Sequence, residues 1–151
     1  MSDLAPRDPA FAARIQASFA KQGLMTSLGA SLLHVAPGMV EIALPASASV
    51  SQQHGFIHAG ALAAIADTAA GYAALSLMSA GVGVLTTEFK INLVAPAKGD
   101  RVIARGRVVK AGRTLTLGQT EVFAESATGE KLVALLTATF MVIEGRDGIA
   151  D

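Results

Sequence analysis

Residues 59–84 read AGALAAIADTAAGYAALSLMSAGVGV, and this segment is the strongest indication of the fold. Asp67 is its only charged residue. The segment is long enough to span a bilayer, but a carboxylate is costly at the centre of a membrane helix, and no Lys/Arg cluster flanks it. A helix that is apolar on every side is otherwise buried on every side. We therefore predict a buried helix over roughly residues 58–79, closed by Gly81 and Gly83, and no membrane association.

The sequence on both sides of this helix has the period of β-strands. Turn residues at 98–100, 111–112 and 127–130 indicate hairpins between the later strands. Long antiparallel strands can bury one apolar helix by curving around it, so we predict an α+β fold with a long central helix wrapped by a curved sheet. The predicted strands are residues 29–35 and 39–44 before the helix, and 84–94, 101–110, 114–124 and 132–143 after it.

The ends of the chain give weaker patterns. Phe11, Ile15 and Phe19 repeat every four residues, which predicts an amphipathic helix over about residues 9–22 that stops at Gly23. The tail from about residue 144 is expected to fray. No repeat or linker interrupts the sequence, and 151 residues suit one core, so we expect a single domain over residues 1–151.

Composition narrows the classes of function. Lys plus Arg and Asp plus Glu number 12 each, which disfavours nucleic-acid binding because that needs a basic surface. The chain has no cysteine, so a thiol nucleophile and a Cys-ligated zinc are excluded. The first residues show no basic segment followed by an apolar run, as a secretory signal would. We expect a cytoplasmic protein.

Asp67 is the first candidate for chemistry. An unpartnered carboxylate is among the groups least often buried. It could be structural, bonded to backbone or to Thr86 or Thr87. It could instead be a general base or nucleophile, and burial would raise its pKa. An isolated acid in an apolar helix favours the functional interpretation.

The second candidate is the segment 52–60, QQHGFIHAG, directly before the helix. Backbone N–H groups at a helix start favour a carbonyl oxygen that gains negative charge. The simpler interpretation is a tight turn into the helix. The three histidines, His34, His54 and His58, have no pattern of a metal site, and we expect none.

Spacing links the two candidates. Asp67 follows Ala59 and Gly60 by seven or eight residues, roughly 11 Å along a helix axis. The acid could hardly reach a carbonyl held at its own helix start. If both act on one substrate, they should come from different chains, which predicts a two-fold homo-oligomer.

The motif itself carries a family resemblance. H-G-x-x-H-x-G followed by L-x-x-x-x-D and G resembles the PaaI-like branch of the hotdog thioesterases, in the 4-hydroxybenzoyl-CoA thioesterase-like superfamily. The segment 86–97, the following Gly-Asp and the G-R-T turn also look like that family, and the likeness covers about residues 9–143. The matching motif residues are His54, Gly55, His58, Gly60, Leu62, Asp67 and Gly71.

The resemblance implies a hotdog fold, a homodimer paired edge to edge that often doubles into a homotetramer, and hydrolysis of an acyl-CoA. Asp67 would activate water or attack the thioester carbonyl, and the N–H of Ala59 from the opposite subunit would polarise it. Gln52 would help to place substrate or water, and Thr86 would lie near the acid. His58 and Gly60 complete the motif at the helix start.

Coenzyme A is part of the substrate in this family, so no separate cofactor is expected. The basic turn with Lys110 and Arg113 is a candidate contact for the CoA phosphates, although a solvated turn is the simpler interpretation. The family usually has H-G-G where this chain has His58-Ala59-Gly60. Ala would be strained at positive φ, so we predict a negative φ at Ala59.

Two other functions stay open at this point. A hotdog hydratase or dehydratase would pair a histidine with an acid for proton transfer, and the spacing of His58 and Asp67 allows it. A non-catalytic protein would bind acyl-CoA as a sensor or partner subunit. The acyl group is not predicted, although Leu62 and Ile65 are expected to line part of its pocket.

Overall fold

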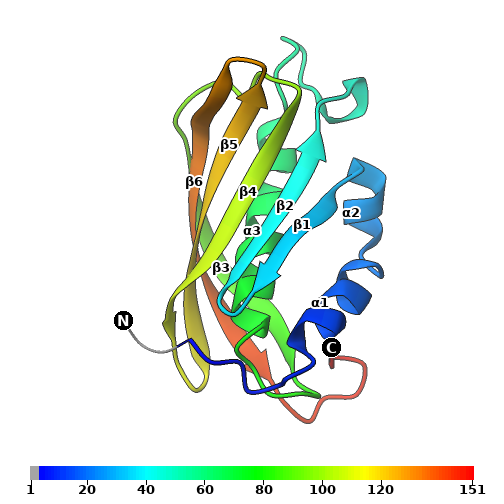
Figure 1. Cartoon of the computed structure of the whole chain (residues 1–151), viewed down its shortest axis with the longest axis vertical. Helices are drawn as coiled ribbons and strands as arrows, with labels where there is room; N and C mark the ends of the chain where they lie inside the picture. Colours follow the sequence, from blue (N-terminus) through cyan, green and yellow to red (C-terminus); the bar gives the residue numbers. More distant parts are fainter. Residues whose placement is uncertain (1–3) are drawn as a thin grey trace.

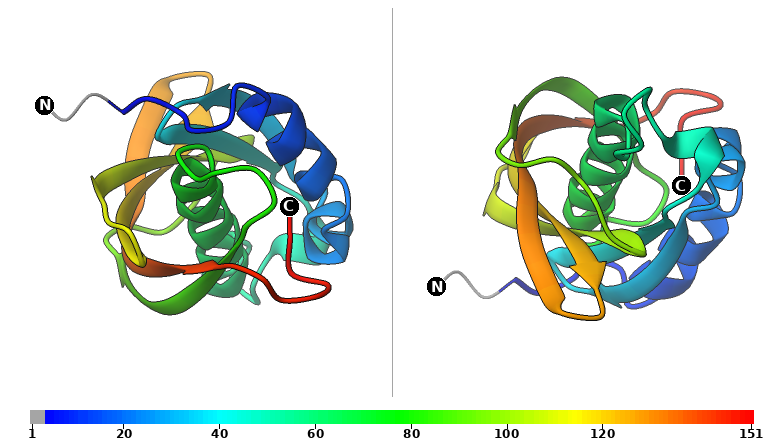
Figure 2. Two further views of the ribbon diagram at one scale, coloured as in Figure 1. Left: turned by 90° about the horizontal axis from the view of Figure 1, so that it is seen from below. Right: turned by 90° about the horizontal axis from the view of Figure 1, so that it is seen from above.

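The computed structural model describes residues 4–151 and shows one curved sheet around one long helix (Figure 1). The six strands lie in the order β1-β2-β4-β5-β6-β3, and all neighbours are antiparallel. Views along the long axis show the sheet curling around α3, with α1 and α2 beside the open side (Figure 2). The predicted α+β hotdog fold is confirmed. The elements are α1 (Phe11–Phe19), α2 (Gly23–Leu28), β1 (Ser31–Ala36), β2 (Met39–Pro45), a short 3-10 turn (Ala48–Val50), α3 (Ala59–Leu75), β3 (Gly83–Leu93), β4 (Arg101–Ala111), β5 (Leu115–Ser126) and β6 (Gly129–Ile143).

One predicted hairpin is wrong. Residues 98–100 do not turn β3 back onto β4, because β3 pairs with β6 and β4 pairs with β2 and β5. The segment instead packs on the end of β5, where Asp100 N–H donates to the Glu125 carbonyl at 2.8 Å. Turn residues report a local change of direction and not the identity of the paired strand. The hairpins at 111–112 and 127–130 are confirmed.

The predicted helices differ from the observed ones at their ends. α3 ends at Leu75 and not near residue 79, and a turn follows. Arg14 holds this end, since its guanidinium donates to the carbonyls of Leu75, Met78 and Ser79. The predicted helix over 9–22 corresponds to α1, and Gly23, expected as its stop, begins α2.

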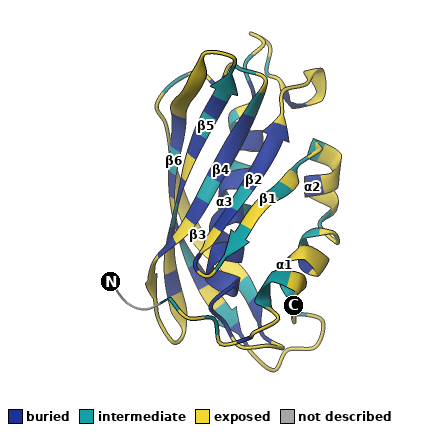
Figure 3. Cartoon of the chain, in the orientation of Figure 1, coloured by how far each residue is buried: buried dark blue, intermediate teal, exposed yellow. Residues whose placement is uncertain are grey.

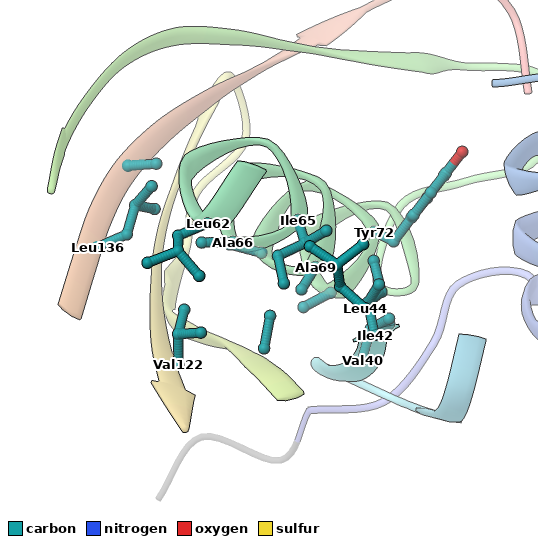
Figure 4. Packing of buried hydrophobic residues seen from close by; sticks show 14 of the residues in the cluster. Val40, Ile42, Leu44, Leu62, Ile65, Ala66, Ala69, Tyr72, Val122 and Leu136 are labelled. Atoms are coloured by element: carbon teal, nitrogen blue, oxygen red, sulfur yellow. The ribbon is translucent and has the colours of Figure 1, made fainter. Parts of the chain in front are cut away.

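The core depends on small residues between α3 and the sheet. A Cβ built on Gly106 of β4 would lie 2.4 Å from the backbone carbon of Ala69. The helix backbone therefore rests almost directly on this strand. Thr120 of β5 adds a hydrogen bond from its hydroxyl to the Ala66 carbonyl at 2.8 Å. Along most of β5 and β6, buried residues alternate with less buried ones, and the buried residues of the sheet pack around α3 (Figures 3 and 4).

The tail after Ile143 forms no helix or strand, but it is held against the domain. The Ser18 hydroxyl of α1 donates to the Asp151 carboxylate. The side chain of Ile149 lies over Gly83, at the start of β3. In the part of the chain that the structure describes, no helix is long and apolar enough to cross a membrane.

Candidate active site

Asp67 lies on the side of α3 that the sheet leaves uncovered. Ala64, Asp67, Thr68 and Gly71 follow each other at helical spacing and line a cavity of about 270 Å³. We call this the acid-side cavity. Tyr72 of α3 also lines it, and the remaining lining residues come from the segment before α2, from α2, from β3 and from β6: Gln22, Leu24, Val84, Thr86 and Phe140.

Thr86 of β3 holds the Asp67 carboxylate. Its hydroxyl donates to both carboxylate oxygens, at 2.9 and 3.2 Å. A β-bulge at Thr87 follows directly, because Thr86 pairs with Phe140 and Glu88 with the adjacent Thr139. Bulges re-aim side chains and often lie next to active sites. Here the extra residue keeps Thr86 on the helix side and Glu88 on the outer side of the sheet.

Burial sets the electrostatics of this acid. Partial burial raises the pKa of the Asp67 carboxyl, and the hydrogen bond from Thr86 opposes that rise. No cation among the described residues pairs with it. The group is thus a stronger base than an ordinary solvated aspartate, and it is held in one orientation.

The start of α3 exposes a single free amide. His58 is the N-cap residue, and its Nδ1 accepts from the N–H of Gly60 at 2.8 Å. The N–H groups of Ala61 and Leu62 donate to the His58 carbonyl. Within residues 4–151, the N–H of Ala59 has no acceptor. Among the four backbone N–H groups in the first turn of α3, only that of Ala59 has no acceptor within the described residues and is available to a ligand.

The conformation at this turn explains the variant motif. No residue other than glycine has a positive φ in the described chain, so the predicted negative φ at Ala59 is confirmed. A Cβ at residue 60 would lie 3.0 Å from Nδ1 of His58. The histidine cap therefore favours glycine at residue 60, because a Cβ there would crowd the ring, whereas residue 59 needs only its N–H.

A larger cavity of about 560 Å³ adjoins this helix start, and we call it the helix-start cavity. Gln52, His58, Ala59 and Leu62 line it on one side. Gln52 is partly committed, because its amide oxygen accepts from the backbone N–H of His54. The opposite wall is the segment 93–97, which connects β3 towards β4. Ile65, expected at the pocket, is instead fully buried against the sheet.

The structure therefore divides the predicted site residues into three groups. Gln52, His58, Ala59 and Gly60 meet at the helix start, and Asp67 meets Thr86 about two turns further along α3. The two cavities share no lining residue. Lys110 and Arg113 lie at the β4–β5 hairpin, at the opposite end of the molecule from the start of α3 (Figure 1). No group of three or more potential metal ligands occurs within residues 4–151.

Comparisons with known proteins identify the family of this chain. The family model described as the thioesterase superfamily matches residues 54–130, about half of the chain and most of both cavities. The chain belongs to the thioesterase superfamily. It is a thioesterase with the PaaI-like hotdog fold, as the sequence motif predicted.

Several solved structures are similar to this thioesterase in sequence or in fold. A thioesterase family protein from Silicibacter pomeroyi is 44% identical, with a TM-score of 0.88 over 89% of this chain and 99% of that one. The phenylacetic acid degradation protein PaaI of Thermus thermophilus, as a mutant, is 30% identical, with a TM-score of 0.70 over 80% and 98%. The E. coli PaaI protein shares the fold, with 22% identity and a TM-score of 0.80 over 92% and 97%.

Sequence reasoning missed Gln22 and Tyr72, which line the acid-side cavity of this thioesterase. Tyr72 is the only tyrosine in the chain and lies in an otherwise Ala-rich helix. A buried tyrosine hydroxyl needs a partner, and that was the available signal. Gln22 gave no signal, since a glutamine between two helices is commonly a solvated residue.

Proposed function

We propose that the protein hydrolyses acyl-CoA thioesters to a carboxylic acid and free CoA, at a site completed by two copies of the chain. The free N–H of Ala59 at the start of α3 carries this proposal. It is a preorganised donor at the positive end of a 17-residue helix and beside an apolar cavity. Such a donor stabilises the oxyanion that forms when a thioester carbonyl is attacked.

Asp67 supplies the second half of the chemistry. As a general base it takes a proton from water while the water oxygen bonds to the carbonyl carbon. The tetrahedral intermediate then expels the thiolate, which recovers the proton as the C–S bond breaks. As a nucleophile, its carboxylate oxygen would attack first and form an anhydride that water hydrolyses. In a single turnover in heavy-oxygen water, an unlabelled Asp67 oxygen in the product acid, or label in the Asp67 carboxylate, would identify the nucleophilic route with water attack at the Asp67 carbonyl carbon. Trapping of the anhydride by hydroxylamine would identify the nucleophilic route when water attacks the acyl carbonyl instead.

The edge strand supports a two-chain site. β3 lies at the edge of the sheet, and no strand of the described chain covers its free side. Phe89 and Leu93 face the helix side of the sheet yet are 49% and 52% exposed. Long, apolar edge strands are usually covered in native proteins. Pairing two β3 edges about a two-fold axis would cover them and bring the helix-start cavity of one copy to the acid-side cavity of the other.

The finer assignments follow from this arrangement. Leu115, Leu117 and Met141 form exposed apolar surface on the outer face, which supports a dimer of dimers. Lys110 and Arg113 are proposed to contact the CoA phosphates from the partner copy, because they lie at the opposite end of their own copy from the start of α3 (Figure 1). Gln52 is proposed to place the substrate through its amide N–H, because its oxygen is already bonded. No cofactor is required, and the cysteine-free composition suits a cytoplasmic enzyme.

A mixing experiment tests the shared site. Proline is well tolerated at the first position of a helix, so Ala59→Pro removes the N–H with little other change. The preceding His58 has φ −64° and ψ 138°, a conformation compatible with a following proline. Ala59→Pro and Asp67→Asn should each be inactive in a free-thiol assay. Ala59→Ser keeps the N–H and is the matched control.

Refolding the two inactive variants together should restore activity. Half of the dimers would be mixed, and each mixed dimer would have one intact site, so about a quarter of the wild-type rate is expected. A mixture that stays inactive, while wild type subjected to the same treatment recovers, would contradict the two-chain site. Wild type that releases no thiol from any acyl-CoA would contradict the proposed reaction.

The geometry of His58 disfavours hydration or dehydration. Its Nδ1 accepts from Gly60, so a neutral ring carries its proton on Nε2 and offers no free base. Incubation with an enoyl-CoA should give no hydrated product. Tight binding of an acyl-CoA without turnover would instead support a non-catalytic binding protein.

A further inference from the structure

A small cavity lies where α3 ends, at the far end of this helix from Ala59. Its volume is about 60 Å³, and we call it the α3-end cavity. One water needs about 10–15 Å³ of such space, so the cavity has room for about four to six waters, or for one phosphate group in their place. Its walls come from the end of α3 and the turn after it, from the β4–β5 hairpin, from the end of β6 and from the N-terminal segment.

Thr116 of β5 presents a hydroxyl to this cavity. The residue is only 3% exposed and lies on the helix side of the sheet. Within residues 4–151 its hydroxyl forms no hydrogen bond, and its oxygen is open to the cavity. Thr120, the other buried threonine of β5, donates instead to the Ala66 carbonyl. Buried polar groups are normally paired, so the Thr116 hydroxyl indicates that the cavity takes a polar ligand.

The charges around the cavity favour an anion. Arg7 and Arg113 both line it, and neither side chain forms an ion pair with any of the described residues. Glu144 is the only carboxylate among the lining residues, so two cations face one anion. Guanidinium groups match the geometry of phosphate oxygens. Two guanidinium groups and the Thr116 hydroxyl therefore suit the three terminal oxygens of a phosphate monoester.

A second cavity of about 440 Å³ adjoins the first, and we call it the flanking cavity. The two share Arg7, Leu77 and Ala111 as lining residues. Leu77 and the half-exposed Val109 give it apolar surface, and Lys110 adds a third cation. Its volume is within the usual range of small-molecule sites, about 300–1,000 Å³. Together the two cavities suit an aromatic ring system joined to a phosphate monoester.

The proposed two-fold pairing brings these cavities to the active site of the other copy. Val82, directly before β3, lines the α3-end cavity. The segment 93–97, where β3 ends, is a wall of the helix-start cavity. Two β3 edges that pair antiparallel about a two-fold axis place the start of one strand beside the end of the other. The α3-end cavity of one copy then lies next to the helix-start cavity of its partner.

We infer that the α3-end cavity binds the 3′-phosphate of the CoA whose thioester lies at the partner's helix start, and that the flanking cavity holds its adenosine. This inference rests on the proposed hydrolysis and its two-chain site. Arg7 and Arg113 pair with the phosphate, and the Thr116 hydroxyl donates to one of its oxygens. Lys110 is then left for the diphosphate. The enzyme thus selects thioesters of CoA over those of carriers that lack this phosphate monoester.

Matched substrates test this selection. We would measure kcat/KM by thiol release for one acyl group, the one that wild type hydrolyses fastest, on CoA and on 3′-dephospho-CoA. Wild type should prefer CoA by at least about tenfold, because charge-assisted hydrogen bonds form only with the 3′-phosphate. Arg7→Gln and Thr116→Val should each lower this preference severalfold. Arg146→Gln, an exposed arginine that lines neither cavity, is the matched control and should keep it.

A competition experiment identifies the source of the bound phosphate. Adenosine 3′,5′-bisphosphate should inhibit wild type competitively, and AMP should inhibit it at least about tenfold more weakly. Arg7→Gln should bring the two inhibitors closer together. Inhibition by the bisphosphate that does not compete with the substrate would place its site apart from the bound CoA, and would overturn the inference.

The ratio of the two substrates separates selection from folding, since a damaged fold lowers both rates together. A wild-type ratio near one, or a ratio that both Arg7→Gln and Thr116→Val leave unchanged, would overturn the inference, while thiol release from both substrates still supports the proposed hydrolysis. No release from either would instead refute the hydrolysis, and the inference with it.

Discussion

The Thr86 hydroxyl donates to both carboxylate oxygens of Asp67, at 2.9 and 3.2 Å. A single hydroxyl between two oxygens orients the carboxylate without neutralising it. Because Thr86 lies on the edge strand and Asp67 in the middle of α3, this contact ties the acid to the strand at which we propose that a second copy joins. The following predictions concern this contact, the start of α3 and the helix–sheet packing.

Thr86→Val should move the acidic limb of the activity profile to higher pH. The hydrogen bond lowers the pKa of Asp67 against the rise caused by burial, so its loss raises that pKa further. A general base works only when ionised, and activity should therefore fall at a higher pH than in wild type. The measurement is kcat/KM against pH. Thr87→Val, whose hydroxyl bonds the Thr139 carbonyl instead, should leave the limb in place.

Asp67→Asn should change stability in a pH-dependent way. The folded pKa of Asp67 is raised, so the folded protein binds more protons than the unfolded chain between the ordinary aspartate pKa of about 3.9 and the raised value. This contribution to stability is fully present below the ordinary value and is lost as pH rises through the raised one. Wild type should lose this contribution as the pH rises from 4 to 7, and the variant should not. The free energy of unfolding of the variant should therefore increase relative to that of wild type over this rise in pH. Urea unfolding at both pH values measures it, and a constant difference would contradict the pKa direction.

Asp67→Asn should also lower kcat by at least about a hundredfold, the usual contribution of a positioned acid–base group. A free-thiol assay with wild type alongside provides the measurement. Glu88→Gln is the control, because this acid lies two residues beyond Thr86 and faces the outer side of the sheet, bonded to Thr139. Loss of activity in both variants would show that removal of either carboxylate is harmful, and would contradict a particular role of the Asp67 carboxylate.

Gly60→Ala should weaken the start of α3. The new Cβ would lie 3.0 Å from Nδ1 of His58, which is a tight contact, so the ring must shift and its hydrogen bond with the N–H of residue 60 should weaken. Loss of a helix cap typically costs about 1 kcal/mol. Activity should fall as well, since Ala59 is the adjacent residue. Gly23→Ala is the control, because its Cβ would have nothing within 4 Å, and it should be neutral or stabilising.

Gly106→Ala should be among the most destabilising single changes. Its Cβ would lie 2.4 and 2.5 Å from backbone atoms of Ala69 and Ala70, and backbone atoms cannot rotate away. Overpacking of this kind costs about 1–3 kcal/mol or more. Arg107→Ala, on the outer face of the same strand, should change stability by only about 0.5 kcal/mol. Comparable losses in the two variants, from urea unfolding curves, would contradict the close packing of α3 on β4.

Much of the fold was predictable because its signals are local. An Ala-rich segment with one acid predicts a buried helix, which is observed, and a candidate site at Asp67, which stays a prediction. The pairing of β3 with β6 was not predictable from turns, since it joins residues about 50 positions apart in the sequence. The bulge at Thr87 could not be predicted either. In a regular strand, Thr86 and Phe89 would lie on opposite faces of the sheet. Because of the bulge, both face the helix.

The site was predictable in part for the same reason. The motif from Gln52 to Gly60 marks the helix start, but it does not tell which amide stays free, because that depends on the rotamer of His58. Gln22 enters the acid-side cavity through a hydrogen bond to Tyr72, which lies 50 residues away in the sequence. Chemistry built from one segment can be predicted from the sequence, and chemistry assembled by packing requires the structure.

The bulge at Thr87 has a consequence for how related sequences should be aligned. It accommodates one additional residue without shifting the pairing of the rest of β3 with β6. A relative that lacks the bulge would therefore be one residue shorter at this position and not in the neighbouring loops. A gap placed in a loop would misalign either Thr86 or Phe89 by one position. Sites compared across such an alignment would then match a residue that faces the helix with one that faces away from it.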